Sequence, residues 1–259
     1  MPTPTAAERA ERLYAARRDR QPIPPLSEES PELTPADAYA IQGRFVERLL
    51  ADGGRVVGYK LGLTSRPMQE MLGVDEPDYG PVLSSMVFDD GVTLRLEDYI
   101  APRIEAEIAL VLDRPLTGPG VTAVQAGQAI AGGVAALELV DSRIADWRIT
   151  LVDTIADLAS SAAIVLGSRV VPLDFDVRQV GMVIRRNGVV EDTGAGAAAL
   201  GSPVGAVAWL ANTLAPFGVT LEPGHVVMTG SLHRAFPLAA GDRVRADFDR
   251  LGSVSCRFV

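Results

Sequence analysis

The stretch from residue 103 to residue 112 constrains the fold more than any other, because it has the pattern of a buried β-strand and yet contains two carboxylates. Successive side chains of a strand point to opposite faces, so Glu105 and Glu107 share one face and stand roughly 6.6 Å apart. The other face is apolar throughout: Ile104, Ala106, Ile108, Leu110 and Leu112. Two unpaired anions on such a strand are costly, and a metal ion between them is the simplest compensation.

A second apolar run, residues 135–141, also has a carboxylate inside it, Glu138. An ion pair with Arg143 or Arg148, both near in sequence, is the alternative explanation for a single buried glutamate. Three carboxylates in two apolar strands favour a divalent cation, because one ion offsets several of them. The chain has only two histidines, which nearly excludes a site built on several imidazoles. Oxygen ligands suit a hard cation such as Mg²⁺ or Mn²⁺.

Composition excludes several other classes of protein. A net charge of −9 without a long basic run argues against nucleic acid or an anionic membrane surface as the main partner. The single cysteine, Cys256, rules out an intramolecular disulfide and suits a reducing compartment. The N-terminus has no apolar core typical of a signal peptide, and no apolar run approaches the length of about 20 residues that spans a membrane. We therefore expect a cytoplasmic globular protein.

Helical patterns occupy the first part of the chain. Residues 5–19 have apolar side chains at helical spacing, and Thr34 followed by Pro35 is typical of a helix start. The second helix is expected to continue through Leu50. We predict that residues 1–54 form a helical N-terminal region.

Strand patterns dominate the rest, with inserted helices expected at 122–134 and 203–217 and a short helix or turn at 66–73. The pair Asn187-Gly188 between two alternating runs predicts a β-hairpin. This arrangement indicates the α+β class, with residues 55–259 as a β-rich domain.

A lysine stands out in the alternating run at 56–63. Lys60 shares its face with Gly58 and Gly62, which indicates open space around it. A solvated strand face and a pocket are both compatible with that pattern, although glycine in a strand often marks the close approach of a ligand or another backbone. Asp78 lies in a proline-rich stretch expected to be a loop, where it is either an ordinary turn carboxylate or a functional one.

Six ordered blocks of the sequence resemble a known family: 58–65, 73–80, 102–109, 136–144, 152–157 and 252–259. They are similar to the 2-keto-4-pentenoate hydratase and 4-oxalocrotonate decarboxylase family, within the fumarylacetoacetase superfamily. The resemblance extends over nearly the whole chain. It implies a fumarylacetoacetase C-terminal-like core, in which mixed sheets form a roll.

The resemblance also implies a set of site residues. The metal ligands for Mg²⁺ or Mn²⁺ are expected to be Glu105, Glu107 and Glu138, in agreement with the strand argument. The residues with active-site roles are expected to be Lys60, Asp78 and Ser160. The family commonly has asparagine at the position of Leu158. Any contact made by that amide is lost here, which can mark a difference in substrate.

Two reactions fit the implied site. A hydratase converts 2-hydroxypenta-2,4-dienoate (2-keto-4-pentenoate) to 4-hydroxy-2-oxopentanoate in the meta-cleavage catabolism of aromatic compounds. A decarboxylase releases CO₂ from 4-oxalocrotonate (2-oxohex-3-enedioate). In both, a metal acts as Lewis acid on the 2-oxo acid. Lys60 is expected to transfer a proton or bind the anionic end of the substrate, Asp78 to orient the lysine or a water, and Ser160 to hydrogen-bond the substrate.

Local features divide between the two reactions. Residues 146–150 look hydratase-like, whereas residues 208–212 and 255–259 look decarboxylase-like. A decarboxylase needs an extra cation for the distal carboxylate, for which Arg143 and Arg234 are candidates. We favour the hydratase.

Two further alternatives are less compatible with the sequence. A non-catalytic partner subunit of the same fold predicts loss of the metal ligands or of the lysine, and all are present. Hydrolysis of a carbon–carbon bond normally needs a histidine-assisted water, and neither histidine lies in the six blocks. The resemblance implies a small 2-oxo or 2-hydroxydienoic acid substrate, a homo-oligomer, and association with the companion decarboxylase or hydratase.

Overall fold

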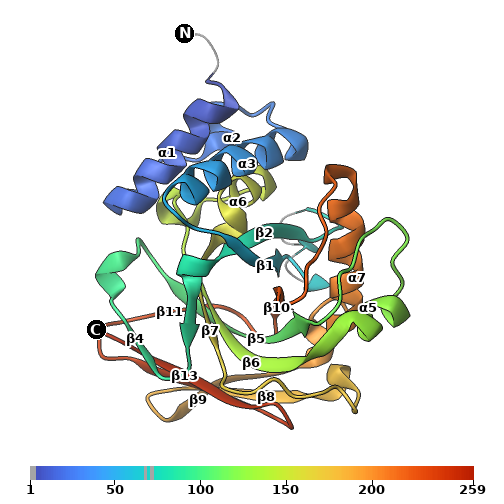
Figure 1. Ribbon diagram of the computed structural model, residues 1–259. Helices are drawn as coiled ribbons and strands as arrows, with labels where there is room; N and C mark the ends of the chain where they lie inside the picture. The colour runs from blue at the N-terminus through green and yellow to red at the C-terminus, as the bar shows by residue number, and fades with distance from the viewer. Residues whose placement is uncertain (1–3, 67–68, 71–72) are drawn as a thin grey trace.

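Two β-sheets stack face to face in the computed structural model, and the N-terminal helices cover the outer side of the larger sheet (Figure 1). The structure describes residues 4–66, 69–70 and 73–259, so the helix or turn predicted at 66–73 lies partly outside the described residues. The predicted α+β class, with a β-rich core of mixed sheets, is confirmed.

The larger sheet contains the carboxylate strands at its centre. Its strand order is β2-β1-β10-β5-β6-β7-β3, with the short β11 also paired to β5. The strands are β1 Val56–Gly62, β2 Asp78–Leu83, β3 Val87–Asp89, β5 Arg103–Leu112, β6 Ile130–Val140, β7 Ser161–Leu166, β10 Val226–Ser231 and β11 Phe236–Pro237. The pairs β1–β10 and β3–β7 are parallel, and the other pairs are antiparallel.

The smaller sheet forms the second layer, with the order β4-β13-β12-β8-β9. Its strands are β4 Val92–Leu94, β8 Gly181–Arg186, β9 Val189–Ala195, β12 Arg243–Phe248 and β13 Gly252–Phe258. The predicted hairpin joins β8 to β9, and Asn187 and Gly188 both have positive φ, as a tight two-residue turn requires.

The helices lie around these sheets. The α-helices are α1 Ala6–Asp19, α2 Leu26–Glu29, α3 Pro35–Ala51, α5 Ala123–Ala129, α6 Leu151–Ala156 and α7 Pro203–Leu214. Single 3₁₀ turns are η1 Ser84–Met86, η2 Leu96–Asp98, η3 Ala145–Trp147, η4 Leu158–Ser160, η5 Val177–Gln179, η6 Gly196–Ala198 and η7 Ala215–Phe217. The helix start predicted at Thr34 is confirmed, and both Thr5 and Thr34 form a capping box with the acid three residues later.

The two faces of β5 separate as the alternation predicts. The even-numbered apolar residues from Ile104 to Leu112 belong to the core between the two sheets. A second apolar cluster lies under the N-terminal helices and joins Leu13 and Phe45 to Val82 and Ile164. The N-terminal helices therefore share an apolar core with the sheet that they cover. The division of the chain into two regions at residue 54 stays a prediction.

The helix predicted at 122–134 is wrong at its C-terminal end. Helix α5 ends at Ala129, and Gly132 and Gly133 belong to β6, where they pair with β5. A Cβ atom on Gly132 would lie 2.5 Å from the backbone oxygen of Val171. Glycine is a poor helix former, and pairing with a long central strand outweighs the short helix pattern.

The segment Gly196–Phe217 is long and apolar enough to resemble a membrane span. Its α-helical part, α7, has only 12 residues. At 1.5 Å per residue this helix is about 18 Å long, which is shorter than a membrane core of about 30 Å. Val207, Leu210 and Leu214 are buried in the core between the sheets, so α7 is a core helix.

Candidate metal centre and active site

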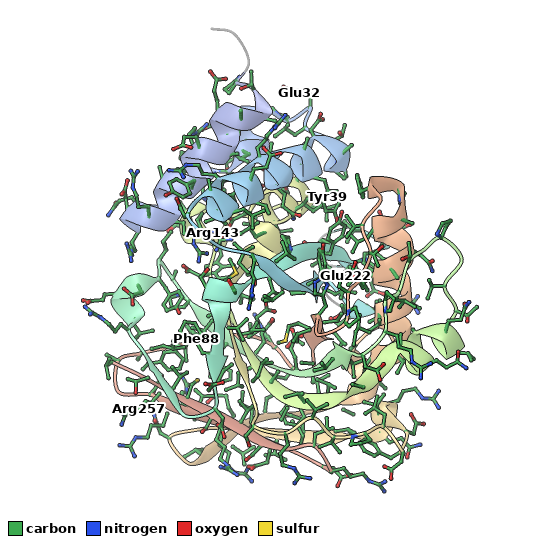
Figure 2. All side chains as sticks on the ribbon, viewed as in Figure 1. Glu32, Tyr39, Phe88, Arg143, Glu222 and Arg257 are labelled. Carbon is green, nitrogen blue, oxygen red and sulfur yellow. The ribbon has the colours of Figure 1, made fainter. Side chains whose placement is uncertain are left out.

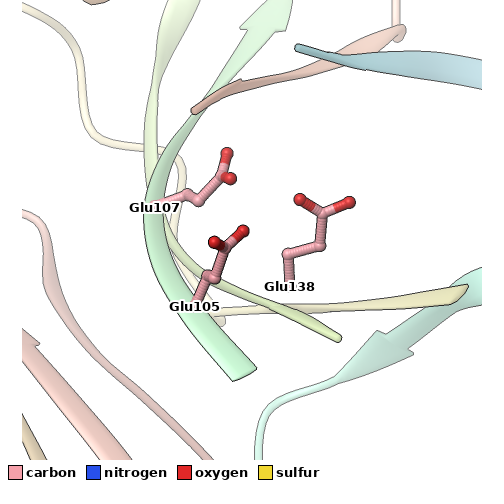
Figure 3. A group of neighbouring side chains, drawn as sticks. All are labelled: Glu105, Glu107 and Glu138. Carbon is pink, nitrogen blue, oxygen red and sulfur yellow. The ribbon is translucent and has the colours of Figure 1, made fainter. Parts of the chain in front are cut away.

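The three predicted metal ligands meet on one side of the central strand pair (Figure 3). Strands β5 and β6 are antiparallel, and their register places Glu105 directly opposite Glu138. One carboxylate oxygen from each of Glu105, Glu107 and Glu138 lies within 4.8 Å of the others. Glu107 and Glu138 are fully buried, whereas Glu105 keeps partial contact with solvent.

Three buried carboxylate oxygens in this cluster have no hydrogen-bond donor among the described residues. Glu107 Oε2 accepts a hydrogen bond of 2.8 Å from the backbone N–H of Gly230. Glu107 Oε1 and both oxygens of Glu138 are buried and accept none from the described part of the chain. Such orphaned oxygens are costly, and hard divalent cations prefer carboxylate oxygens as ligands. The donor set therefore fits a divalent metal ion.

Burial and mutual repulsion also change the acidity of this cluster. Burial raises the pKa of Glu105 to about 7, with repulsion from Glu138 in the same direction and the charge of Lys60 opposing it. Burial and the two neighbouring glutamates hold the pKa of Glu107 well above its usual range. Burial likewise raises the pKa of Glu138, against the charge of Lys60. The raised pKa values favour the protonated forms of these carboxyl groups, so protons compete with a metal ion for the cluster.

We expect the affinity for Mg²⁺ or Mn²⁺ to rise with pH up to at least about 7, the raised pKa of Glu105, because below it a metal ion must displace the proton of that carboxyl group. The slope should be about tenfold per pH unit for each proton displaced. Calorimetric titrations of metal into protein, in two buffers of different ionisation enthalpy, measure both the affinity and the protons released. A pH-independent affinity would contradict the raised pKa.

Without metal, the free energy of unfolding should instead decrease as the pH rises. A carboxyl group with a raised pKa in the folded state stabilises the fold below its unfolded pKa. That contribution is lost as the pH rises through the folded value, about 7 for Glu105.

Lys60 reaches the cluster from β1. Its Nζ lies 3.4 Å from Glu138 Oε2 and donates a hydrogen bond of 2.8 Å to the backbone oxygen of Ala159. Burial lowers the pKa of Lys60, but Glu138, Asp78 and the other two glutamates outweigh it, so the net pKa is raised. The lysine is thus held protonated, and this favours a charge-stabilising or proton-donating role. Lys60 is also the only lysine in the chain.

The glycines beside Lys60 do not leave open space, and that expectation is wrong. A Cβ atom on Gly62 would lie 2.1 Å from Asp78 Oδ1, and one on Gly58 would lie 1.9 Å from the backbone oxygen of Val226. The glycines instead allow close approach of a carboxylate and of strand β10.

Asp78 is not a loop residue, because it begins β2 and pairs with Gly62. Both of its carboxylate oxygens are buried and accept no hydrogen bond within the described ranges. Burial raises the pKa of Asp78, and the charge of Lys60 opposes this. The buried Asp78 carboxylate therefore lies within reach of the Lys60 charge.

Ser160 closes an unusual turn next to the lysine. Leu158, Ala159 and Ser160 all have left-handed φ values, of 58°, 51° and 57°. This conformation costs about 1–2 kcal/mol for each non-glycine residue, so the surrounding structure must impose it. The Ser160 hydroxyl is buried and has no hydrogen-bond partner among the residues that the structure describes.

Leu158 departs from the asparagine that the family resemblance predicts. Asparagine adopts the left-handed region more readily than leucine does. The Leu158 side chain is fully buried in the apolar cluster under the N-terminal helices. Burial of this side chain offsets part of the conformational cost.

An internal ion pair holds this turn in place. The Arg143 guanidinium binds the Asp157 carboxylate, and the backbone N–H of Arg143 donates to Asp157 Oδ2 at 2.8 Å. Arg143 Nη1 also donates to the Ser161 backbone oxygen at 3.0 Å. Figure 2 shows Arg143 beneath the N-terminal helices. The two roles considered for Arg143, a partner of Glu138 and a substrate cation, are therefore wrong. Arg148 pairs with Glu28 on the surface.

Replacing Arg143 with alanine is expected to destabilise the fold by about 3–5 kcal/mol, because it leaves the Asp157 carboxylate buried without its partner. Arg148→Ala is the matched control, since the loss of an exposed ion pair costs about 1 kcal/mol or less. Urea unfolding of the two variants in EDTA measures both effects. Equal stabilities would contradict a structural role for the Arg143–Asp157 pair.

Sequence reasoning missed the backbone groups of the site. The Gly230 N–H and the Ala159 oxygen carry no side-chain signal. Gly230, however, interrupts a strand pattern, with φ 111° and a register shift between Met228 and Ser231. A glycine inside a strand is a recognisable sign of such a bulge.

The chain matches known proteins over most of its length. Residues 66–259 match the model of the family described as fumarylacetoacetate (FAA) hydrolase C-terminal. The chain therefore belongs to the fumarylacetoacetate hydrolase C-terminal family, and the resemblance seen in the sequence is confirmed.

Similar proteins include two curated hydratases. The chain is 41% identical to the 2-oxo-hept-4-ene-1,7-dioate hydratase of Escherichia coli over 257 residues, 96% of each chain. It is 44% identical to the 2-keto-4-pentenoate hydratase of Paraburkholderia xenovorans (strain LB400), over 97% of this chain and 94% of that one. A solved structure of the 4-oxalocrotonate decarboxylase from Pseudomonas putida G7, complexed with magnesium and adipate, has a TM-score of 0.96 and 37% identity and covers all of both chains.

Proposed function

We propose that this protein is a metal-dependent lyase that hydrates 2-hydroxypenta-2,4-dienoate to 4-hydroxy-2-oxopentanoate in the catabolism of aromatic compounds. The observation that carries the proposal is the cluster of three glutamates with orphaned buried oxygens next to a buried, protonated lysine. Glu105, Glu107 and Glu138 would hold Mg²⁺ or Mn²⁺, which supplies Lewis-acid stabilisation of a 2-oxo acid. The identity of the relatives as hydratases supports this reaction class.

The chain's own residues supply the remaining steps. The Lys60 ammonium donates a proton to the carbon chain of the dienol, or balances the charge on its oxygen. Asp78, which lies close to Lys60, orients the lysine or the attacking water. The Ser160 hydroxyl has no partner among the described residues and is available to bind the substrate. Hydration requires protonation at C5 of the dienol and addition of water at C4.

Decarboxylation of 4-oxalocrotonate is the second candidate, because the decarboxylase structure aligns over all of this chain. It needs the same stabilised 2-oxo group, with loss of the distal carboxylate in place of water addition. We place the protein in the cytoplasm as a homo-oligomer, with the companion enzyme of the same family as a candidate partner.

One assay distinguishes the two reactions. Purified protein with Mg²⁺ or Mn²⁺ is given the dienol and the unsaturated dicarboxylate separately, while ultraviolet absorbance and CO₂ release are followed. We expect loss of dienol absorbance without CO₂. Release of CO₂ from the dicarboxylate would favour the decarboxylase, and turnover of neither substrate would sink both candidates.

A further inference from the structure

One of the two histidines, His233, contacts the strand that holds two of the expected metal ligands. It lies in the loop between β10 and β11, outside the six blocks of the family resemblance. The backbone N–H of Ala106 donates a hydrogen bond of 2.8 Å to His233 Nε2. Ala106 stands between Glu105 and Glu107 in β5. The imidazole ring therefore binds the strand at the residue that separates these two glutamates.

The ring fills a gap in the strand pairing of β5. Strand β10 stops pairing with β5 at Glu107, and β11 resumes the pairing at Ile104. In between, the Leu232 N–H donates to the Ala106 backbone oxygen at 3.0 Å, and the His233 ring accepts the Ala106 N–H. Ala106 is fully buried, and a buried backbone N–H without a partner is costly. The imidazole thus takes the place of a strand partner.

Both ring nitrogens of His233 have a partner, and the two partners define its tautomer. Nε2 accepts the Ala106 N–H and therefore carries no proton. Nδ1 lies 2.8 Å from the backbone oxygen of Arg234, which can only accept, so Nδ1 carries the proton. Burial lowers the pKa of His233, against the Arg234 oxygen and the charges of Asp192 and Glu191, and this favours the neutral ring.

Contacts within and around the loop orient the ring. The Ser231 hydroxyl donates to the His233 backbone oxygen at 2.6 Å, and the centroid of the Phe236 ring lies 5.8 Å from that of the imidazole. A Cβ atom on Gly194, in β9, would lie 2.1 Å from the Leu232 backbone oxygen. The smaller sheet therefore packs directly against the loop and limits its movement.

Glu105 is the expected ligand that depends most on its backbone. The other two have contacts of their own, from the Gly230 N–H and from the Lys60 ammonium. The Glu105 carboxylate has no hydrogen bond or ion pair within the part of the chain that the structure describes. Its peptide group with Ala106 is planar, so the hydrogen bond to His233 restricts the rotation that would turn Glu105 away from the cluster.

We propose that His233 is a positioning residue for the metal centre. Its Nε2 holds the peptide group between Glu105 and Ala106, and this sets the direction in which the Glu105 carboxylate meets the other two. The proposal rests on the proposed function, because it concerns the metal ion that this function requires. Groups that orient metal ligands tune the affinity of a site without touching the ion.

Metal affinity tests this role. Calorimetric titration of Mn²⁺ into metal-free protein should show about 10–100-fold weaker binding by His233→Ala, the usual cost of losing a group that orients a ligand. His233→Gln should recover part of the affinity, because its amide oxygen can accept the Ala106 N–H. His225→Ala is the matched control. The His225 ring also accepts a backbone N–H, from Glu222 at 3.2 Å, but lies at the other end of β10, so its loss should leave the affinity unchanged.

The number of sites in the same titration separates positioning from folding. A variant that only folds poorly should bind fewer metal ions per chain with unchanged affinity. Loss of positioning should weaken the affinity and keep the number of sites. A His233→Ala variant with fewer sites of unchanged affinity would therefore contradict the proposal.

Nitrogen NMR of the imidazole rings observes the contact without metal or substrate. The chain contains two histidines, so protein labelled with ¹⁵N-histidine gives two ring systems, and the spectrum of His225→Ala assigns them. We expect His233 to be protonated at Nδ1 and unprotonated at Nε2 near neutral pH. Protonation at Nε2 would remove the acceptor for the Ala106 N–H and overturn the proposal.

The titrations also distinguish this proposal from the proposed function. If the unmodified protein binds Mn²⁺ and His233→Ala binds it equally well, His233 has no positioning role, and the metal centre stands. A glutamine variant that binds no better than the alanine variant would likewise overturn the role of Nε2 as acceptor. If the unmodified protein binds neither Mn²⁺ nor Mg²⁺, the metal centre fails, and with it the proposed function.

Discussion

A Glu107→Gln variant is expected to bind Mg²⁺ and Mn²⁺ at least about a hundredfold more weakly and to lose activity by about three orders of magnitude. Loss of a residue that merely orients a ligand typically costs 10–100-fold in affinity, and removal of a ligand should cost more. Glutamine has the size of glutamate and can still accept the hydrogen bond from the Gly230 N–H. The effect therefore reports the missing charge. Calorimetric metal titration measures it, with the exposed Glu222 changed to glutamine as control.

The same variant should be more stable than the unmodified protein in EDTA. Burial and repulsion raise the pKa of Glu107, so folding must either protonate this carboxyl group or bury its charge, and glutamine avoids that cost. With metal present the order should reverse, since a ligand at a hundred times its Kd stabilises the unmodified fold by about 2.7 kcal/mol. Thermal unfolding with EDTA and with Mg²⁺ tests this reversal. A variant less stable than the unmodified protein under both conditions would indicate a structural glutamate.

A Lys60→Met variant is expected to lose about two to four orders of magnitude in kcat, the usual contribution of a proton-transferring group. Its metal affinity should increase, because the glutamates lose the cation that competes for their charge. In EDTA the variant should be less stable by about 3–5 kcal/mol, since Glu138 is left buried and unpaired. Metal addition should recover much of this loss. Weakened metal binding would contradict the assignment of Lys60 as a competing cation.

The protonation of Lys60 can be observed directly, because the chain contains no other lysine. Protein labelled with ¹⁵N-lysine has one Nζ signal. We expect that signal to remain that of an ammonium above its ordinary pKa when the glutamates surround it without metal. Addition of Mg²⁺ should lower the pKa of Lys60, because a second cation now neutralises the same carboxylates.

The features that the sequence by itself determined depend on neighbours along the chain. The alternation in β5 placed Glu105 and Glu107 on one face, because the period of a strand is a local property. The N-terminal caps and the Asn187-Gly188 turn were predictable for the same reason, since each is made within a few residues. The apolar run at 135–141 indicated Glu138 as a third carboxylate, and the resemblance to the family implied that it belongs to one site with Lys60.

Only the tertiary structure decided which distant groups meet. The β5–β6 register brings Glu138 opposite Glu105, and the β1–β2 register brings Asp78 against Gly62, which the sequence had suggested was open space. The sequence allowed Arg143 to pair with Glu138 or with a substrate, and in the folded protein it is buried against Asp157. Such pairings are selected by packing and desolvation across the whole fold, where one strand pairing excludes another. The residues within a short stretch of sequence do not determine which distant strands pair.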